Sequence, residues 1–88
     1  MSFVEEIRNE LGQLMMIAQN VSGQIDIANA LINDLDTGML AVRGAGAPPS
    51  TDIADAWNLV REAGESLGNV KQMMAEYAGK ILDYSSRL

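Results

Sequence analysis

Apolar residues recur at intervals of three and four throughout the first half of the chain. The unbroken series consists of Val4, Ile7, Leu11, Leu14, Ala18, Val21, Ile25, Ala28, Ile32, Leu35, Met39 and Val42. A heptad pattern of this length predicts one long α-helix whose apolar stripe packs along another helix. No other feature constrains the fold as strongly, because a helix this long needs an equally long element to cover its stripe.

The second half of the chain supplies that element. Its apolar residues have the same spacing: Ile53, Ala56, Val60, Ala63, Leu67, Val70, Met74, Tyr77, Ile81, Tyr84 and Leu88. The segment between the two series contains Pro48 and Pro49, which cannot continue a helix. We therefore predict an all-α fold, an antiparallel coiled-coil-like hairpin. It forms one domain over residues 1–88, with a helix at about 3–43, a loop at about 44–50 and a helix at about 51–86.

The residues at the expected helix ends fit this division. Ser2 followed by Glu5 is typical of a capping box at the start of the first helix. Gly44 is expected to end that helix in the left-handed conformation. Either Ser50 or Thr51 is expected to cap the second helix.

The short loop also predicts which residues of the two helices face each other. If the hairpin is symmetric about the loop, the numbers of facing residues add to 95. Small residues then oppose large ones, as Ala18 opposes Tyr77 and Ala63 opposes Ile32. Close packing between helices favours such pairs.

One side of the apolar stripe is widened by further apolar residues, namely Ile17, Leu31, Leu59 and Met73. A chain of 88 residues buries little surface on its own, and a hairpin has only one mutual seam. We therefore expect this flank to pack against a second copy, as a homo-oligomer that is most simply a four-helix bundle dimer, or against another helical protein. The other side is expected to face water. It carries Arg8, Met15, Ser22, Asn29, Asp36, Trp57, Gly64 and Lys71.

Trp57 is the single tryptophan and lies just off the apolar stripe. Two interpretations are open. The indole can fill the space left by Gly38 on the facing helix, or it can be an exposed binding residue of the kind that interfaces favour. We include Trp57 with Ile17, Leu31, Leu59 and Met73 as a candidate interface residue.

The composition argues against catalysis and against nucleic-acid binding. The chain has no cysteine and no histidine, so the commonest nucleophiles, general bases and metal ligands are missing. The segment Asp34-Leu35-Asp36-Thr37-Gly38 begins like a calcium loop but lacks the later glycine and glutamate. The net charge of -6 opposes binding to phosphates. We expect no enzyme activity, no catalytic residue, no cofactor or metal, no nucleic-acid partner and no membrane span.

The cysteine-free acidic chain, with two long helices joined at Arg43-Gly44-Ala45-Gly46, resembles the WXG100, or ESAT-6-like, family of type VII secretion. The layout of Gly44-x-Gly46, Ala54-Asp55-Ala56-Trp57 and Tyr77-Ala78 is also similar to small helical proteins encoded beside toxin and secretion genes in actinobacteria. These resemblances imply a bacterial partner-binding or chaperone-like role near a toxin. The expected localisation is cytoplasmic, or exported without a cleavable signal peptide.

From the residues we predict a non-enzymatic protein-protein interaction or assembly module. The alternative is a structural subunit that self-assembles into a filament or a larger shell. Three large apolar residues lie off both the stripe and its flank and favour the alternative: Ile27, Leu40 and Leu82.

Overall fold

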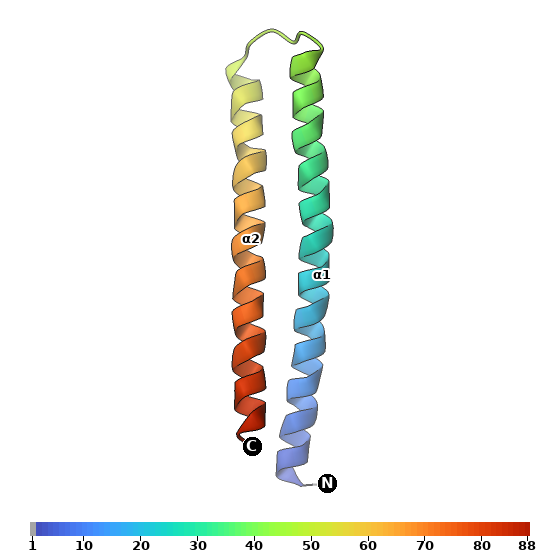
Figure 1. The fold of residues 1–88 in the computed structure, drawn as a ribbon, viewed down its shortest axis with the longest axis vertical. Helices are drawn as coiled ribbons and strands as arrows, with labels where there is room; N and C mark the ends of the chain where they lie inside the picture. The colour runs from blue at the N-terminus through green and yellow to red at the C-terminus, as the bar shows by residue number, and fades with distance from the viewer. Residues whose placement is uncertain (1) are drawn as a thin grey trace.

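The computed structural model describes residues 2–88 and consists of two α-helices joined by a short loop (Figure 1). Helix α1 spans Phe3–Gly44 and helix α2 spans Thr51–Ser86. The helices run antiparallel along their whole length, and the loop closes one end (Figure 1). The predicted all-α helical hairpin is confirmed. The helix bounds expected from the sequence differ from these by one residue, at Gly44.

Serine side chains cap both helices at their N-termini. The Ser2 hydroxyl accepts a hydrogen bond from the backbone N–H of Glu5 at 3.2 Å, which confirms Ser2 as the cap of α1. The Ser50 hydroxyl accepts one from the N–H of Asp52, also at 3.2 Å. Ser50 is therefore the cap of α2, and Thr51 is its first helical residue.

The end of α1 differs from the prediction. Gly44 is the last residue of the helix and has no left-handed conformation; the residue with positive φ is Gly46, at 84°. Ala45 remains in the right-handed region, and its N–H donates to the carbonyl of Ala41 at 2.9 Å. The helical hydrogen bonds thus extend past Gly44, and the chain turns two residues later than expected.

Contacts between the helices confirm the predicted register. A Cβ placed at Gly64 would lie 3.5 Å from Cγ2 of Ile32, and these two residue numbers add to 96. Asp26 and Lys71, whose numbers add to 97, form an ion pair across the hairpin. Slipping one helix by a heptad would change these totals to values near 88 or 102. The observed totals lie one and two above the expected value of 95.

The interior of the hairpin is thin. The structure measures 67 × 15 × 14 Å. Within residues 2–88, the buried apolar side chains are those of Leu11, Ala18 and Ile25, and none of the side chains is completely buried. In a hairpin of two helices, the apolar stripe of each helix is exposed to solvent along at least one side. The fold therefore rests on few buried contacts for its length.

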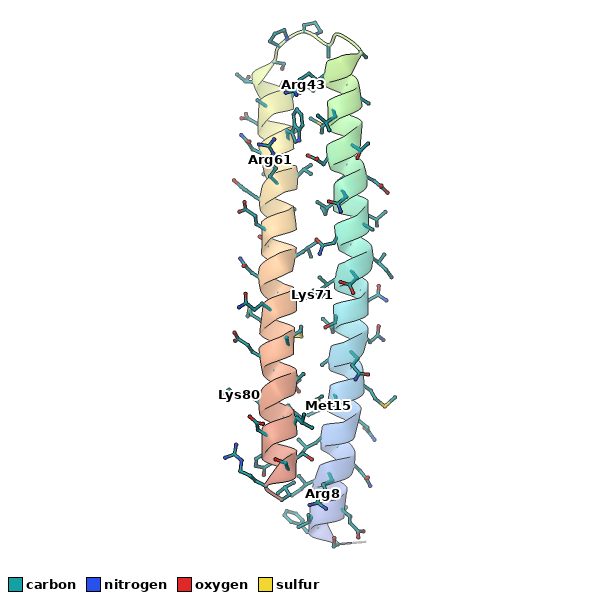
Figure 2. All side chains as sticks on the ribbon, in the orientation of Figure 1. Arg8, Met15, Arg43, Arg61, Lys71 and Lys80 are labelled. Atoms are coloured by element: carbon teal, nitrogen blue, oxygen red, sulfur yellow. The ribbon has the colours of Figure 1, made fainter. Side chains whose placement is uncertain are left out.

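The helices are rotated relative to the expected seam. The buried residues of α1, Leu11, Ala18 and Ile25, are spaced by seven, and Ile32 and Met39 continue this row as half-buried residues. Beside them, Met15, Ser22, Asn29 and Asp36 are half-buried, whereas Leu14, Val21 and Leu35 on the opposite side are exposed. The expectation that the side of Met15 and Asp36 faces water is therefore wrong. Figure 2 shows Met15, Arg43 and Lys71 along the line between the helices.

Small and polar residues explain this rotation. Ser22 on α1 and Gly64 and Ala78 on α2 are small, half-buried residues, and small residues allow two helices to come close on this side. On the same side, the indole of Trp57 donates a hydrogen bond to Asp36 from the other helix. The small residues and this hydrogen bond together favour contact between the helices on the polar side, and the apolar side is left exposed.

Replacement by alanine is expected to have opposite effects on stability at two glycines, Gly68 and Gly46. Gly68 lies inside α2, and a Cβ placed there would have no other side chain and no atom of α1 within 4 Å, so G68A is expected to stabilise the protein by about 1 kcal/mol. G46A forces alanine into a positive φ and is expected to destabilise it by about 1 kcal/mol. Thermal unfolding followed by circular dichroism, at one fixed protein concentration, measures both changes. A stabilising G46A would contradict the loop geometry.

Candidate interaction surfaces

One side of the hairpin carries a continuous set of exposed large apolar side chains from both helices. We define this apolar face by Leu14, Ile17, Val21, Leu31, Leu35, Leu59, Val70, Met73 and Tyr84. Equivalent heptad positions of antiparallel helices lie on the same side of their seam, so the rows of α1 and α2 form one surface. Leu14, Ile17 and Val21 line a hollow of about 180 Å³ together with Met74 and Tyr77. The apolar face therefore crosses from one helix to the other.

The four flank residues predicted as an interface lie on the apolar face. Ile17, Leu31, Leu59 and Met73 have side chains between 59% and 65% exposed. Such exposure is high for large apolar residues that share one side of a protein. The structure thus places these four residues on a common surface, and their role in binding remains a prediction.

Charged residues border the apolar face at the end away from the loop. Glu10 lies one heptad before Ile17 in α1, whereas Lys80 and Arg87 lie one and two heptads after Met73 in α2. All three side chains are exposed. The border is therefore acidic on α1 and basic on α2.

The fifth predicted interface residue, Trp57, lies on the other side of the hairpin. Its indole N–H donates to Oδ1 of Asp36 at 2.6 Å, and its ring is half-buried. No Trp57 atom lies within 4 Å of a Cβ placed at Gly38. The interpretation that Trp57 fills the space beside Gly38 is therefore wrong. The indole is instead fixed by the carboxylate of Asp36, two residues before Gly38 in α1.

Two arginines complete the surroundings of Trp57. The guanidinium carbons of Arg43 and Arg61 lie 4.9 and 5.3 Å from the centre of the indole ring. Figure 2 shows these arginines near the loop, one on each helix. The cluster was not among the sites predicted from the sequence. The register could have indicated it, because the numbers of Asp36 and Trp57 add to 93, near the value expected for facing residues.

Two aspartates that reach across the hairpin are expected to differ in their contribution to stability. D36A removes a charge-assisted hydrogen bond to a half-buried indole and is expected to cost about 1–2 kcal/mol. D26A removes an ion pair whose side chains are each more than half exposed, and is expected to cost less than about 0.5 kcal/mol. Urea unfolding measures the free energy of unfolding lost in each of the two variants. Only D36A is expected to change the emission of Trp57, and equal losses would contradict the difference in burial.

The part of the chain that the structure describes, residues 2–88, contains no group of three acidic side chains arranged to hold a metal ion. None of its helices combines the length and the apolar character needed to cross a membrane. No protein-family model, curated protein or solved structure matches the chain. The resemblance to the WXG100 family stays a prediction. In the structure, Trp57 lies in the second turn of α2 and not in the loop.

Proposed function

We propose that the protein is a non-enzymatic assembly module in which two copies pack their apolar faces together as a four-helix bundle dimer. The observation that carries the proposal is the contrast between the long exposed apolar face and the few buried residues of a single hairpin. Covering such a face removes apolar surface from water, which is the main driving force of protein association. The absence of cysteine and histidine supports a binding role over a catalytic one.

The dimensions of the hairpin support a second copy as the occupant. A side 67 Å long and 15 Å wide offers roughly 1,000 Å² of surface, whereas a stable interface buries about 800 Å² on each partner. A second hairpin has the same length and the same two apolar rows. It can therefore cover the whole face, which a shorter partner would leave partly exposed.

The charged border supports one arrangement of the two copies. If both loops lie at the same end, α1 of one copy runs antiparallel to α2 of the other. Glu10 then lies opposite Arg87 of the second copy, because their numbers add to 97, near the total for residues at one level. Lys80 lies one heptad farther along the same row. Opposite charges at the rim of an interface favour the correct pairing of partners.

The proposal predicts that glutamates at Leu31 and Leu59 separate the two copies. These residues lie near the middle of the apolar face, one on each helix, and are exposed in the single hairpin. Their substitution therefore acts on association more than on the hairpin itself. A variant of unchanged mass would contradict the proposal.

A structural subunit of a filament or larger shell is the second candidate. Three exposed apolar side chains outside the apolar face favour it: Ile27, Leu40 and Leu82. Contacts between different patches on successive copies do not close and so produce open assemblies. In that case L40E with L82E would abolish large species seen in the wild-type protein. For the closed dimer, the same substitutions leave the mass unchanged.

The type VII secretion or toxin-associated role is a narrower form of the proposal, in which the apolar face covers a different helical protein. The support is the hairpin fold together with the resemblance stated from the sequence. This form predicts that the chain alone is a poorly helical monomer, and that co-expression with its partner gives a folded complex of one copy of each. A well-folded homodimer that persists in the presence of that partner would contradict it.

A further inference from the structure

The loop end of the hairpin contains two adjoining hollows with different linings. The first, of about 300 Å³, is formed mainly by apolar residues of the loop and the neighbouring helix ends: Val42, Ala47, Pro48, Pro49, Ile53 and Ala54. The second, of about 220 Å³, is lined by Arg43, Ala54, Trp57, Asn58 and Arg61. Arg43, Ala54 and Trp57 border both hollows. We call the two together the loop-end cup.

The polar part of the loop-end cup is held in place before any ligand binds. Asp36 fixes the indole of Trp57 through the 2.6 Å hydrogen bond, and the guanidinium groups of Arg43 and Arg61 lie near the ring. Contacts of this kind hold planar guanidinium groups over the ring while leaving their N–H edges able to donate hydrogen bonds. Two forked donors therefore lie on one small surface.

The charge of this surface is unbalanced. Within residues 2–88, the ion pair that the structure contains joins Lys71 to Asp26, so Arg43 and Arg61 make no ion pair with a carboxylate. Asp36 is the acidic group of the cluster, and one of its oxygens accepts from Trp57. Two guanidinium groups beside one carboxylate leave the cup positive, although the chain as a whole has a net charge of -6.

We propose that the loop-end cup binds an acidic segment of a partner protein, with a carboxylate at Arg43 and Arg61 and a neighbouring apolar side chain in the hollow beside Pro48 and Pro49. Arginine donates to carboxylates in paired hydrogen bonds, and apolar hollows with a few polar groups are typical of binding sites. Nucleic acid is a poor fit, because two arginines must act against twelve acidic residues in the chain. The polar hollow, with Trp57 and Arg61, lies on the side of the hairpin away from the apolar face, so binding of the carboxylate does not depend on the proposed dimer.

The single tryptophan provides a direct readout of binding. We would titrate the full chain with the blocked peptide acetyl-Glu-Leu-Glu-amide and follow the fluorescence of Trp57. A saturable change is expected that weakens as salt is added, because the ionic contacts are exposed. Replacing either the two glutamates by glutamine or the leucine by glycine is expected to weaken binding at least about tenfold, a change of about 1.4 kcal/mol in binding free energy.

Paired charge substitutions distinguish binding at the loop-end cup from an effect of the protein's overall charge. R43Q with R61Q is expected to lose binding, whereas R8Q with K71Q removes the same charge elsewhere and is expected to retain it. Circular dichroism and light scattering establish that each variant keeps its helices and its mass, so a failed dimer is distinguished from a failed cup. The inference is overturned by equal binding of the acidic and neutral peptides, by unchanged binding in the R43Q/R61Q variant, or by binding of phosphatidylglycerol vesicles in place of the peptide.

Discussion

Replacing Leu31 and Leu59 together by glutamate is expected to convert the dimer into monomers of 9.5 kDa. Each leucine side chain buried in an interface contributes about 2 kcal/mol, and the dimer contains four of them. The substitution also places four negative charges inside the interface, where they have no partner. The dissociation constant is expected to rise on the order of a thousandfold or more, since each factor of ten corresponds to about 1.4 kcal/mol.

L40E with L82E is the matched control for this experiment. Leu40 and Leu82 are 46% and 61% exposed, carry the same side chain, and lie one on each helix outside the apolar face. Light scattering measures the mass of both variants, and circular dichroism measures the helix that remains. We expect the dimer to survive in the control and to be lost in the variant of the apolar face. Dissociation of both variants alike would place the interface elsewhere.

Replacing Ile25 by alanine is expected to produce the largest loss of stability among single truncations. Ile25 is 6% exposed and is one of the few buried apolar residues within residues 2–88. Truncating a buried isoleucine to alanine costs about 2–5 kcal/mol, because contacts are lost and a cavity remains. A small domain has only about 5–15 kcal/mol of total stability. The variant is therefore expected to be partly unfolded well below the melting temperature of the wild-type protein.

Ile27 provides the control for this truncation, two residues farther along the same helix. Its side chain is 57% exposed, so I27A is expected to change the free energy of unfolding by less than about 0.5 kcal/mol. Urea unfolding at a fixed protein concentration compares the two variants, because the stability of an oligomer depends on concentration. Similar losses of unfolding free energy for I25A and I27A would show that the buried residues of α1 do not dominate the stability of the hairpin.

The helices and their register could be predicted because they depend on local and repetitive features. The heptad pattern determines where α1 and α2 run, Ser2 and Ser50 begin them, and the prolines interrupt the pattern between them. With a loop this short, the register follows from the position of the turn. The one-residue extension of α1 and the positive φ of Gly46 do not change that geometry enough to shift a heptad.

The rotation of the helices could not be predicted from apolar spacing. The two apolar rows of each helix are equivalent in a heptad pattern, and the sequence alone does not show which of them turns toward the partner helix. The small residues Ser22 and Gly64 and the hydrogen bond between Asp36 and Trp57 favour the observed side. The loop-end cup was missed for a related reason: it forms only when the loop folds beside the ends of both helices.

Light scattering of the purified wild-type chain over a range of concentrations measures directly whether two copies associate. For the closed dimer we expect a constant mass of about 19 kDa, twice that of one chain, at concentrations above the dissociation constant. A fully helical monomer of 9.5 kDa at every concentration would contradict it, because the apolar face would then remain exposed to water. A mass that climbs steadily with concentration would contradict the closed dimer and favour the structural subunit.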